Sequence, residues 1–121
     1  MRTSTILVVD DDRAVRGLAE HILRSEGYRV YVAEGAADAI AIAHQLQCGL
    51  DLLLTDMVMP GIDGHDLILS IRRICPHMST MLMSGGFVAD DTRSKNYKIV
   101  RKPFTTAQLL AAVKEILDAH I

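Results

Sequence analysis

Short apolar runs recur along the chain and predict the strands of a sheet. Residues 6–9 and 52–55 are runs typical of strands that are buried on both faces. A run at residues 80–83 predicts a further strand, and residues 99–100 predict a brief one. Residues 28–32 alternate in polarity, so we expect this strand to be more exposed and to lie near an edge of the sheet.

Between these runs, apolar residues recur at the spacing of one helix face. The stripes are Val15, Leu18, Ala19, Ile22 and Leu23; Ala36, Ala39, Ile40, Ala43 and Leu46; Leu67, Ile68 and Ile71; and Leu109, Ala112, Val113 and Ile116. Gly27 lies where a left-handed residue ends a helix, and Thr105 with Gln108 forms a capping-box signature. Residues 89–96 are polar and lack clear periodicity, so we expect at most a short, marginal helix there.

Strands that alternate with helices within 121 residues predict one α/β domain over residues 1–121. We expect a five-stranded parallel sheet that is doubly wound, with right-handed crossovers and helices on both faces. Half of the residues are hydrophobic, which is enough for one core. Sheets of this kind place their functional groups at the carboxyl ends of the strands.

Composition excludes several classes of function. Thirteen Lys and Arg against fifteen Asp and Glu give a net charge of −2, which is too balanced for a protein that binds a phosphate backbone, so we expect no direct nucleic-acid partner. No apolar run approaches the ~18 residues of a membrane span, and the start of the chain lacks the order of a signal peptide. We therefore expect a cytoplasmic protein without a membrane segment.

The chain has two cysteines, Cys48 and Cys75, which lack the spacing of a C-x-x-C pair and belong to no disulfide-dense pattern. We expect two reduced thiols that fill core space. By this interpretation the two cysteines have no functional role.

Polar residues follow four of the predicted strands at the edge where functional groups are expected. They are Asp10, Asp11 and Asp12 after the first strand, Asp56 after the third, Ser84 after the fourth and Lys102 after the fifth. Neighbouring carboxylates repel one another unless a cation neutralises them, and oxygen ligands of this kind suit Mg²⁺. A hydroxyl and an ammonium opposite them would hold the outer oxygens of a phosphoryl group, and a carboxylate between them would be a nucleophile for phosphorus.

A simpler interpretation exists for each of these residues alone. A single Asp after a strand is more often a helix cap or a turn former, and Ser84 before two glycines or Lys102 before a proline would be ordinary turn or surface residues. The whole set, in order after successive strands, favours the metal and phosphoryl site.

Four motifs carry a family resemblance. They are V-V-D-D-D at residues 8–12, L-L-T-D-M-V-M-P-G-I-D-G at residues 53–64, M-S-G-G at residues 83–86 and K-P-F at residues 102–104. Together they resemble the receiver domain of two-component response regulators, of the kind found in chemotaxis receivers, over nearly the whole chain. The resemblance implies a flavodoxin-like fold with strand order 2-1-3-4-5.

The resemblance also implies a role for individual residues. Asp56 matches the phospho-acceptor and Asp11 the direct ligand of Mg²⁺. Asp10 would hold the metal through water, and Asp56 itself and the backbone carbonyl of Val58 would complete the protein's ligands. Asp12 is expected to be a solvated neighbour or a helix N-cap.

Two further residues match the part of the family's site that follows the phosphoryl group. Ser84 matches the hydroxyl, and Lys102 matches the lysine that contacts the phosphoryl group, with a cis Lys102–Pro103 peptide bond. The partner would be a histidine kinase or a histidine phosphotransfer protein, with the downstream protein left unnamed. The protein would be a monomer or a weak homodimer, and would catalyse only its own phosphorylation and dephosphorylation.

The chain departs from the family pattern in two places. Ile99 stands where receivers usually carry an aromatic switch residue, so the coupling of Ser84 to this position is altered; Tyr97 shares a strand face with Ile99 but lies two positions earlier. The segment between Ser84 and Lys102 is also shorter than usual and polar, which would alter the face used for output.

Other functions remain as alternatives. A phosphatase of the haloacid dehalogenase type would use Asp10 as its nucleophile, with Asp12, Ser84 and Lys102 in support. Against it, Ala14 replaces the expected Thr or Val, no acidic pair follows the lysine, and Asp56 would have no role. A nucleotide-binding fold is disfavoured because the loop after the first strand is acidic and would repel phosphate. A stand-alone receiver and a piece of a longer regulator or hybrid kinase both fit the sequence.

Overall fold

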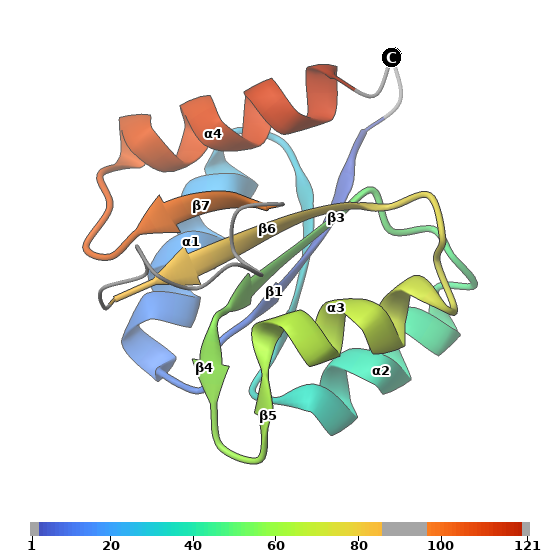
Figure 1. The fold of residues 1–121 in the computed structure, drawn as a ribbon. Helices are drawn as coiled ribbons and strands as arrows, with labels where there is room; N and C mark the ends of the chain where they lie inside the picture. The colour runs from blue at the N-terminus through green and yellow to red at the C-terminus, as the bar shows by residue number, and fades with distance from the viewer. Residues whose placement is uncertain (1–2, 86–96, 120–121) are drawn as a thin grey trace.

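The computed structural model describes residues 3–85 and 97–119, and the marginal helix expected at residues 89–96 lies outside the described residues. The elements are β1 (Thr5–Val9), α1 (Arg13–Ser25), β2 (Arg29–Ala33), α2 (Ala36–Gln45), β3 (Leu52–Asp56), β4 (Val58–Met59), β5 (Ile62–Asp63), α3 (Gly64–Arg72), β6 (Ser79–Ser84), β7 (Lys98–Arg101) and α4 (Thr106–Asp118). Five of the strands form a parallel sheet in the order β2-β1-β3-β6-β7 (Figure 1). If only the five strands of this sheet are numbered along the chain, β6 and β7 are the fourth and fifth, and the order is 2-1-3-4-5. This order confirms the expected fold class.

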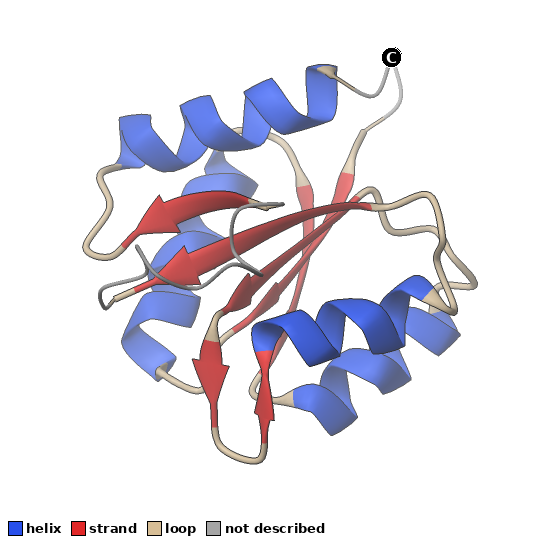
Figure 2. Cartoon of the chain, viewed as in Figure 1, coloured by secondary structure: helices blue, strands red, loops and turns tan. Residues whose placement is uncertain are grey.

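Helices cover both faces of the sheet, α1 and α4 on one side and α2 and α3 on the other (Figure 2). Successive side chains of a strand point to opposite faces, so Ile6 and Val8 pack in the first core while Leu7 and Val9 pack in the second. All four are fully buried. Each such side chain stabilises the fold by about 1.5–3 kcal/mol through burial, which explains why β1 is an unbroken apolar run.

The register of the strands brings their carboxyl ends to one edge of the sheet. Val9 of β1 pairs with Thr55 of β3, so the residues that come next, Asp10 and Asp56, lie side by side. Asp56 pairs with Met83 of β6, and Ser84 pairs with Arg101, the residue before Lys102. Pairing therefore extends β3, β6 and β7 by one or two residues beyond the expected runs, because the ladder hydrogen bonds continue into the polar positions.

The local signals of the helices are confirmed. Asp12 is the N-cap of α1, where its carboxylate accepts a hydrogen bond from the backbone N–H of Ala14 at 2.9 Å. Gly27 follows the end of α1 with a φ of +104°, which a residue without Cβ adopts freely. Thr105 and Gln108 form the expected capping box of α4.

A short antiparallel hairpin of β4 and β5 stands beyond the carboxyl end of β3 (Figure 1). The sequence signals at this place predicted only turns. Gly61 has a φ of +84° in the connection, and Asp63 caps α3 by accepting the backbone N–H of Asp66 at 2.8 Å. A Cβ at Gly64 would collide with the carbonyl of Asp56, so this glycine lets α3 begin directly against the end of β3.

The two cysteines are free thiols, as predicted. Cys75 is buried in the core between the sheet and α2 and α3. Cys48 is exposed, so the expectation that both fill core space is wrong for this residue. The cause is the turn after α2, where Gln47 and Cys48 both have positive φ angles and lead the chain away from the helix.

Candidate functional site

Asp10 is held rigidly at the end of β1. Its backbone N–H donates to the carbonyl of Ala33 at 3.2 Å, and its own carbonyl accepts a hydrogen bond from Arg16 Nη1 at 2.8 Å. Its carboxylate is fully buried, and Oδ1 accepts the backbone N–H of Asp12 at 2.9 Å. Among the described residues, Oδ2 has no well-aligned hydrogen bond, but Lys102 Nζ lies 2.8 Å away as its counter-charge.

Asp56 is the last residue of β3 and keeps a narrow opening to solvent, with 11% of its side chain exposed. Its Oδ2 lies 3.3 Å from Lys102 Nζ, and its Oδ1 lies 3.5 Å from the backbone N of Val58, which is at the limit of a hydrogen bond. Burial raises the pKa of Asp56, the nearby charge of Asp10 raises it further, and Lys102 lowers it in part. The fold thus makes the ionised form of Asp56 costly.

Lys102 lies between the two buried carboxylates. Burial by itself would lower its pKa, but the close contact of its ammonium with the Asp10 carboxylate and the charges of Asp56 and Asp10 outweigh that effect and raise it. The backbone N–H of Lys102 donates to the carbonyl of Ser84 at 2.8 Å, and the Lys102–Pro103 peptide bond is cis, as expected. Lys102 is therefore an ammonium fixed to the ends of both β6 and β7.

Ser84 ends β6 and is 4% exposed. Because its backbone is bonded to Lys102, the two residues expected to contact one group are neighbours in space. Asp11 is exposed and offers an approach from solvent to the same edge.

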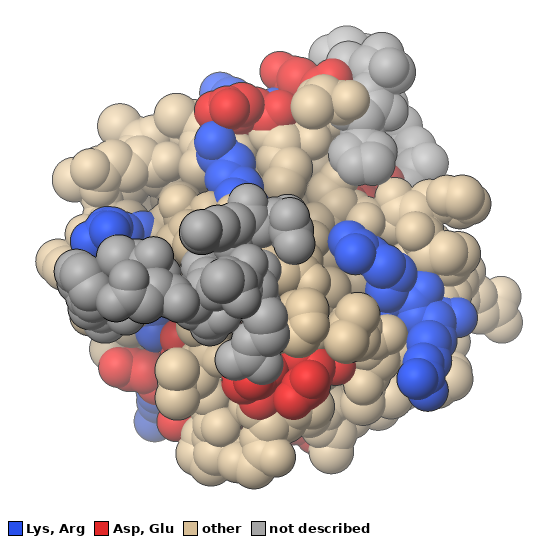
Figure 3. Space-filling view, viewed as in Figure 1, with Lys and Arg blue, Asp and Glu red and all other residues tan. Residues whose placement is uncertain are grey.

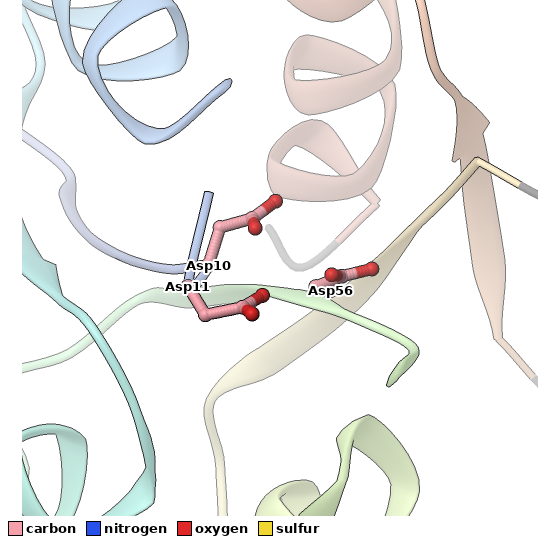
Figure 4. A group of neighbouring side chains, drawn as sticks. All are labelled: Asp10, Asp11 and Asp56. Carbon is pink, nitrogen blue, oxygen red and sulfur yellow. The ribbon is translucent and has the colours of Figure 1, made fainter. Parts of the chain in front are cut away.

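Asp10, Asp11 and Asp56 form one acidic group. Each offers a carboxylate oxygen within 4.8 Å of the others (Figure 4). Three carboxylates against the single ammonium of Lys102 leave a formal charge of −2 on the group. Buried and exposed carboxylate oxygens at this spacing, with one oxygen that lacks a well-aligned donor, suit a hard divalent cation.

Val58 begins β4 and its side chain is 75% exposed. It lies two residues after Asp56, with its backbone beside the Asp56 carboxylate. Asp10, Asp11, Lys102 and Val58 thus lie beside Asp56, and Ser84 is bonded to Lys102, whereas Asp12 caps α1.

Ile99 lies in β7 opposite Leu82 and packs, half-buried, on the core beneath α2 and α3. Tyr97, just before β7, packs on the same core, and its phenol oxygen contacts Nδ1 of His65 in α3 at 2.9 Å. No sequence pattern predicted this contact, because 32 residues separate the two partners.

Outside this edge, charge is distributed in small groups. Figure 3 shows a stripe of basic side chains on the right of the face that it displays and separate groups of acidic side chains elsewhere on that face. Within the described residues, no helix is long and apolar enough to cross a bilayer.

Comparison with known proteins decides the family. The model for the response regulator receiver domain matches residues 6–114. The chain belongs to this family. The resemblance that the four motifs carried is confirmed, and the parallel sheet is the flavodoxin-like sheet of a receiver domain.

Individual relatives agree with this assignment. The chain is 33% identical over 122 residues to the sensor kinase CckA of Brucella abortus (strain 2308), covering 96% of this chain and 13% of that protein. The crystal structure of the receiver domain of the hybrid histidine kinase CckA is 34% identical, with a TM-score of 0.82 and coverage of 94% of this chain and 99% of the other. A CheY-like receiver domain protein from Methanospirillum hungatei JF-1 has a TM-score of 0.87 at 28% identity, with coverage of 98% and 97%.

The phosphatase alternative has no support in these findings. Its nucleophile would be Asp10, which is fully buried and lies 2.8 Å from Lys102. Asp56, which that alternative leaves without a role, lies in the acidic group and keeps its opening to solvent. The receiver domain of a two-component system is the function that the family assignment gives.

Proposed function

We propose that this receiver domain accepts a phosphoryl group on Asp56 from the phosphohistidine of a histidine kinase or histidine phosphotransfer protein. The observation that carries the proposal is the position of Asp56 at the end of β3, with Lys102 Nζ 3.3 Å from Oδ2 and with Asp10 and Asp11 in the same acidic group. Asp56 is the only member of that group at the end of the central strand, and it combines partial exposure with a neighbouring ammonium.

Mg²⁺ is the cofactor that we assign to the acidic group. Asp11 would hold it directly, Asp10 through water, and Asp56 and the Val58 carbonyl would supply the remaining protein ligands. When bound, Mg²⁺ neutralises charge on the carboxylates and on the transferring phosphoryl group.

The chain's own residues then carry the transfer. A carboxylate oxygen of Asp56 attacks phosphorus, a new O–P bond forms, and the N–P bond to the donor's imidazole breaks, so the electron pair returns to the ring nitrogen. Lys102 Nζ moves its contact from the Asp56 oxygen to an oxygen of the phosphoryl group, and the Ser84 hydroxyl donates to another. Attack by water later releases phosphate and restores Asp56, so the protein catalyses only its own modification and its reversal.

The conformational change that follows phosphorylation reaches β7 through the backbone hydrogen bond between Ser84 and Lys102. Phosphorylation adds a charge of about −1.5 to −2 at Asp56. The Lys102 ammonium moves toward the negatively charged phosphoryl group. Because the backbone N–H of Lys102 is bonded to the Ser84 carbonyl, the ends of β6 and β7 move together. Ile99, three residues before Lys102, carries the change to the surface that binds the downstream protein. A pre-existing equilibrium between two conformations is thereby shifted.

The proposal is tested with a small phosphodonor. The protein is incubated with Mg²⁺ and acetyl phosphate or carbamoyl phosphate, and its intact mass is measured. We expect a labile gain of one phosphoryl group that Asp56→Asn abolishes. Asp63→Asn is the matched control, because Asp63 caps α3 and lies outside the acidic group; it should still be labelled. Label that survives Asp56→Asn and disappears in Asp10→Asn would instead support the phosphatase.

A further inference from the structure

The two cysteines meet at the edge of the sheet opposite the acidic group. Cys48 lies in the turn between α2 and β3, and Cys75 lies in the turn between α3 and β6. β3 and β6 are paired neighbours, and the first pair of their register is Leu52 with Ser79. Each cysteine precedes its member of that pair by four residues, so the register itself brings the two turns together.

Hydrogen bonds fix the two turns against each other. The Cys48 thiol donates to the carbonyl of Ile74, the residue before Cys75. The backbone N–H of Ser79 donates to the carbonyl of Asp51 at 2.9 Å, which ties the same two turns a second time. Cys75 is itself held by its backbone N–H, which donates to the Ile71 carbonyl at 2.8 Å.

The two thiols differ in exposure. Cys48 is exposed and Cys75 is 2% exposed, and both line one hollow of about 500 Å³. Burial, followed by the interaction with the neighbouring Cys48 side chain, raises the pKa of Cys75 to about 11. Cys48 is thus the member of the pair that a reagent in solvent reaches first.

We propose that Cys48 and Cys75 are a redox modification site, at which a peroxide converts the two thiols into a reversible intramolecular disulfide. The Cys48 sulfur attacks one peroxide oxygen, which yields a sulfenic acid at Cys48 and one molecule of water when the peroxide is hydrogen peroxide. The Cys75 sulfur then attacks the Cys48 sulfur, the S–O bond breaks, and the hydroxyl leaves with the thiol proton as a second water. Two electrons pass to the peroxide in total, and a thiol reductant restores both cysteines.

A metal site is the less favoured use of the pair. Within residues 3–85 and 97–119, the only group of three potential ligands close enough to hold an ion is Asp10, Asp11 and Asp56. His77 lines the same hollow as the cysteines but does not complete such a group. Two neighbouring thiols of unequal exposure are instead suited to oxidation of the exposed thiol, followed by formation of a disulfide with the buried one.

The proposal is independent of phosphorylation and is tested on the whole 121-residue chain. The protein is treated with hydrogen peroxide, quenched with N-ethylmaleimide under denaturing conditions, and examined by intact mass and by peptide mapping without reduction. We expect the loss of two hydrogen atoms, no maleimide on either cysteine, and a peptide pair joined through Cys48 and Cys75. Dithiothreitol should restore two sites for maleimide.

Two variants separate the steps. Cys75→Ala should leave Cys48 as a sulfenic acid that dimedone traps, and Cys48→Ser should leave Cys75 free to react with maleimide after denaturation. Because Cys75 is buried and its replacement can impair folding, Cys48→Ser and the wild type alone are sufficient for the decision. The proposal is overturned if wild-type Cys48 gains oxygen while Cys75 still takes up maleimide, or if the disulfide forms only between two chains.

Discussion

The phenol oxygen of Tyr97 lies 2.9 Å from Nδ1 of His65, and the two rings meet edge to face with their centroids 5.6 Å apart. The pair joins the first turn of α3 to the residue before β7. Tyr97 packs on the same core as Ile99, which occupies the position where receivers usually carry an aromatic residue. This protein therefore has a contact between an aromatic ring of α3 and the ring of the residue before β7, two positions before Ile99.

Tyr97→Phe should lower the free energy of unfolding by about 0.5–1.5 kcal/mol, because it removes one hydrogen bond and keeps the ring. Urea denaturation measures the change. A double-mutant cycle with His65→Ala tests the cause, since a direct contact gives an interaction energy of at least about 0.5 kcal/mol. Additive effects of the two substitutions would show that the contact contributes nothing to stability.

Ile99→Ala should leave phosphorylation from acetyl phosphate largely intact while it changes the affinity for the phosphodonor protein or the downstream protein. The reason is that Ile99 lies in β7 on the core beneath α3, away from the acidic group. Phosphorylation is followed by intact mass, and affinity by titration calorimetry. Equal losses of both would mean that Ile99 is only a core residue.

Lys102→Met should destabilise the protein by about 3–5 kcal/mol, because it leaves the fully buried carboxylate of Asp10 without its counter-charge. Urea denaturation in the absence of divalent cations measures the effect. Adding Asp10→Asn to Lys102→Met should recover part of the loss, since the second substitution removes the unpaired charge. A double variant that is as unstable as the single one would refute this explanation.

Mg²⁺ should raise the melting temperature of the wild type. A ligand present at ten times its dissociation constant stabilises the folded state by about 1.4 kcal/mol, if it binds only that state. Differential scanning fluorimetry in MgCl₂ is compared with NaCl of equal ionic strength. Asp11→Asn should remove most of the stabilisation, whereas Asp38→Asn, in the first turn of α2 and not a member of the acidic group, should retain it.

In buffer without divalent cations, Asp56→Asn should be more stable than the wild type at neutral pH. Burial and the charge of Asp10 raise the pKa of Asp56, so its ionisation costs more in the folded than in the unfolded state. The cost is fully present at a pH above the pKa that Asp56 has in the folded protein. It disappears as the pH falls from that pKa to the lower pKa of the unfolded chain. The stability difference between the two proteins should therefore shrink on acidification; a difference that grows would contradict the direction of the shift.

The local order of residues determined the fold class and the membership of the site. Apolar runs and helical stripes depend only on neighbours a few residues apart, and in a parallel sheet the ends of successive strands share one edge. For that reason Asp10, Asp11, Asp56, Ser84 and Lys102 could be grouped from the sequence. The caps at Asp12 and Thr105 were predictable for the same reason, since each bonds within its own first turn.

Only the tertiary structure decided which side chains meet. Lys102 was expected opposite the carboxylates, and in the structure its ammonium forms ion pairs with both Asp10 and Asp56. The contacts of Tyr97 with His65, and of Cys48 with the turn of Cys75, join residues 32 and 26 positions apart. No local period encodes such pairs, because they depend on how α3 packs against the sheet and on where the turns after α2 and α3 leave their helices.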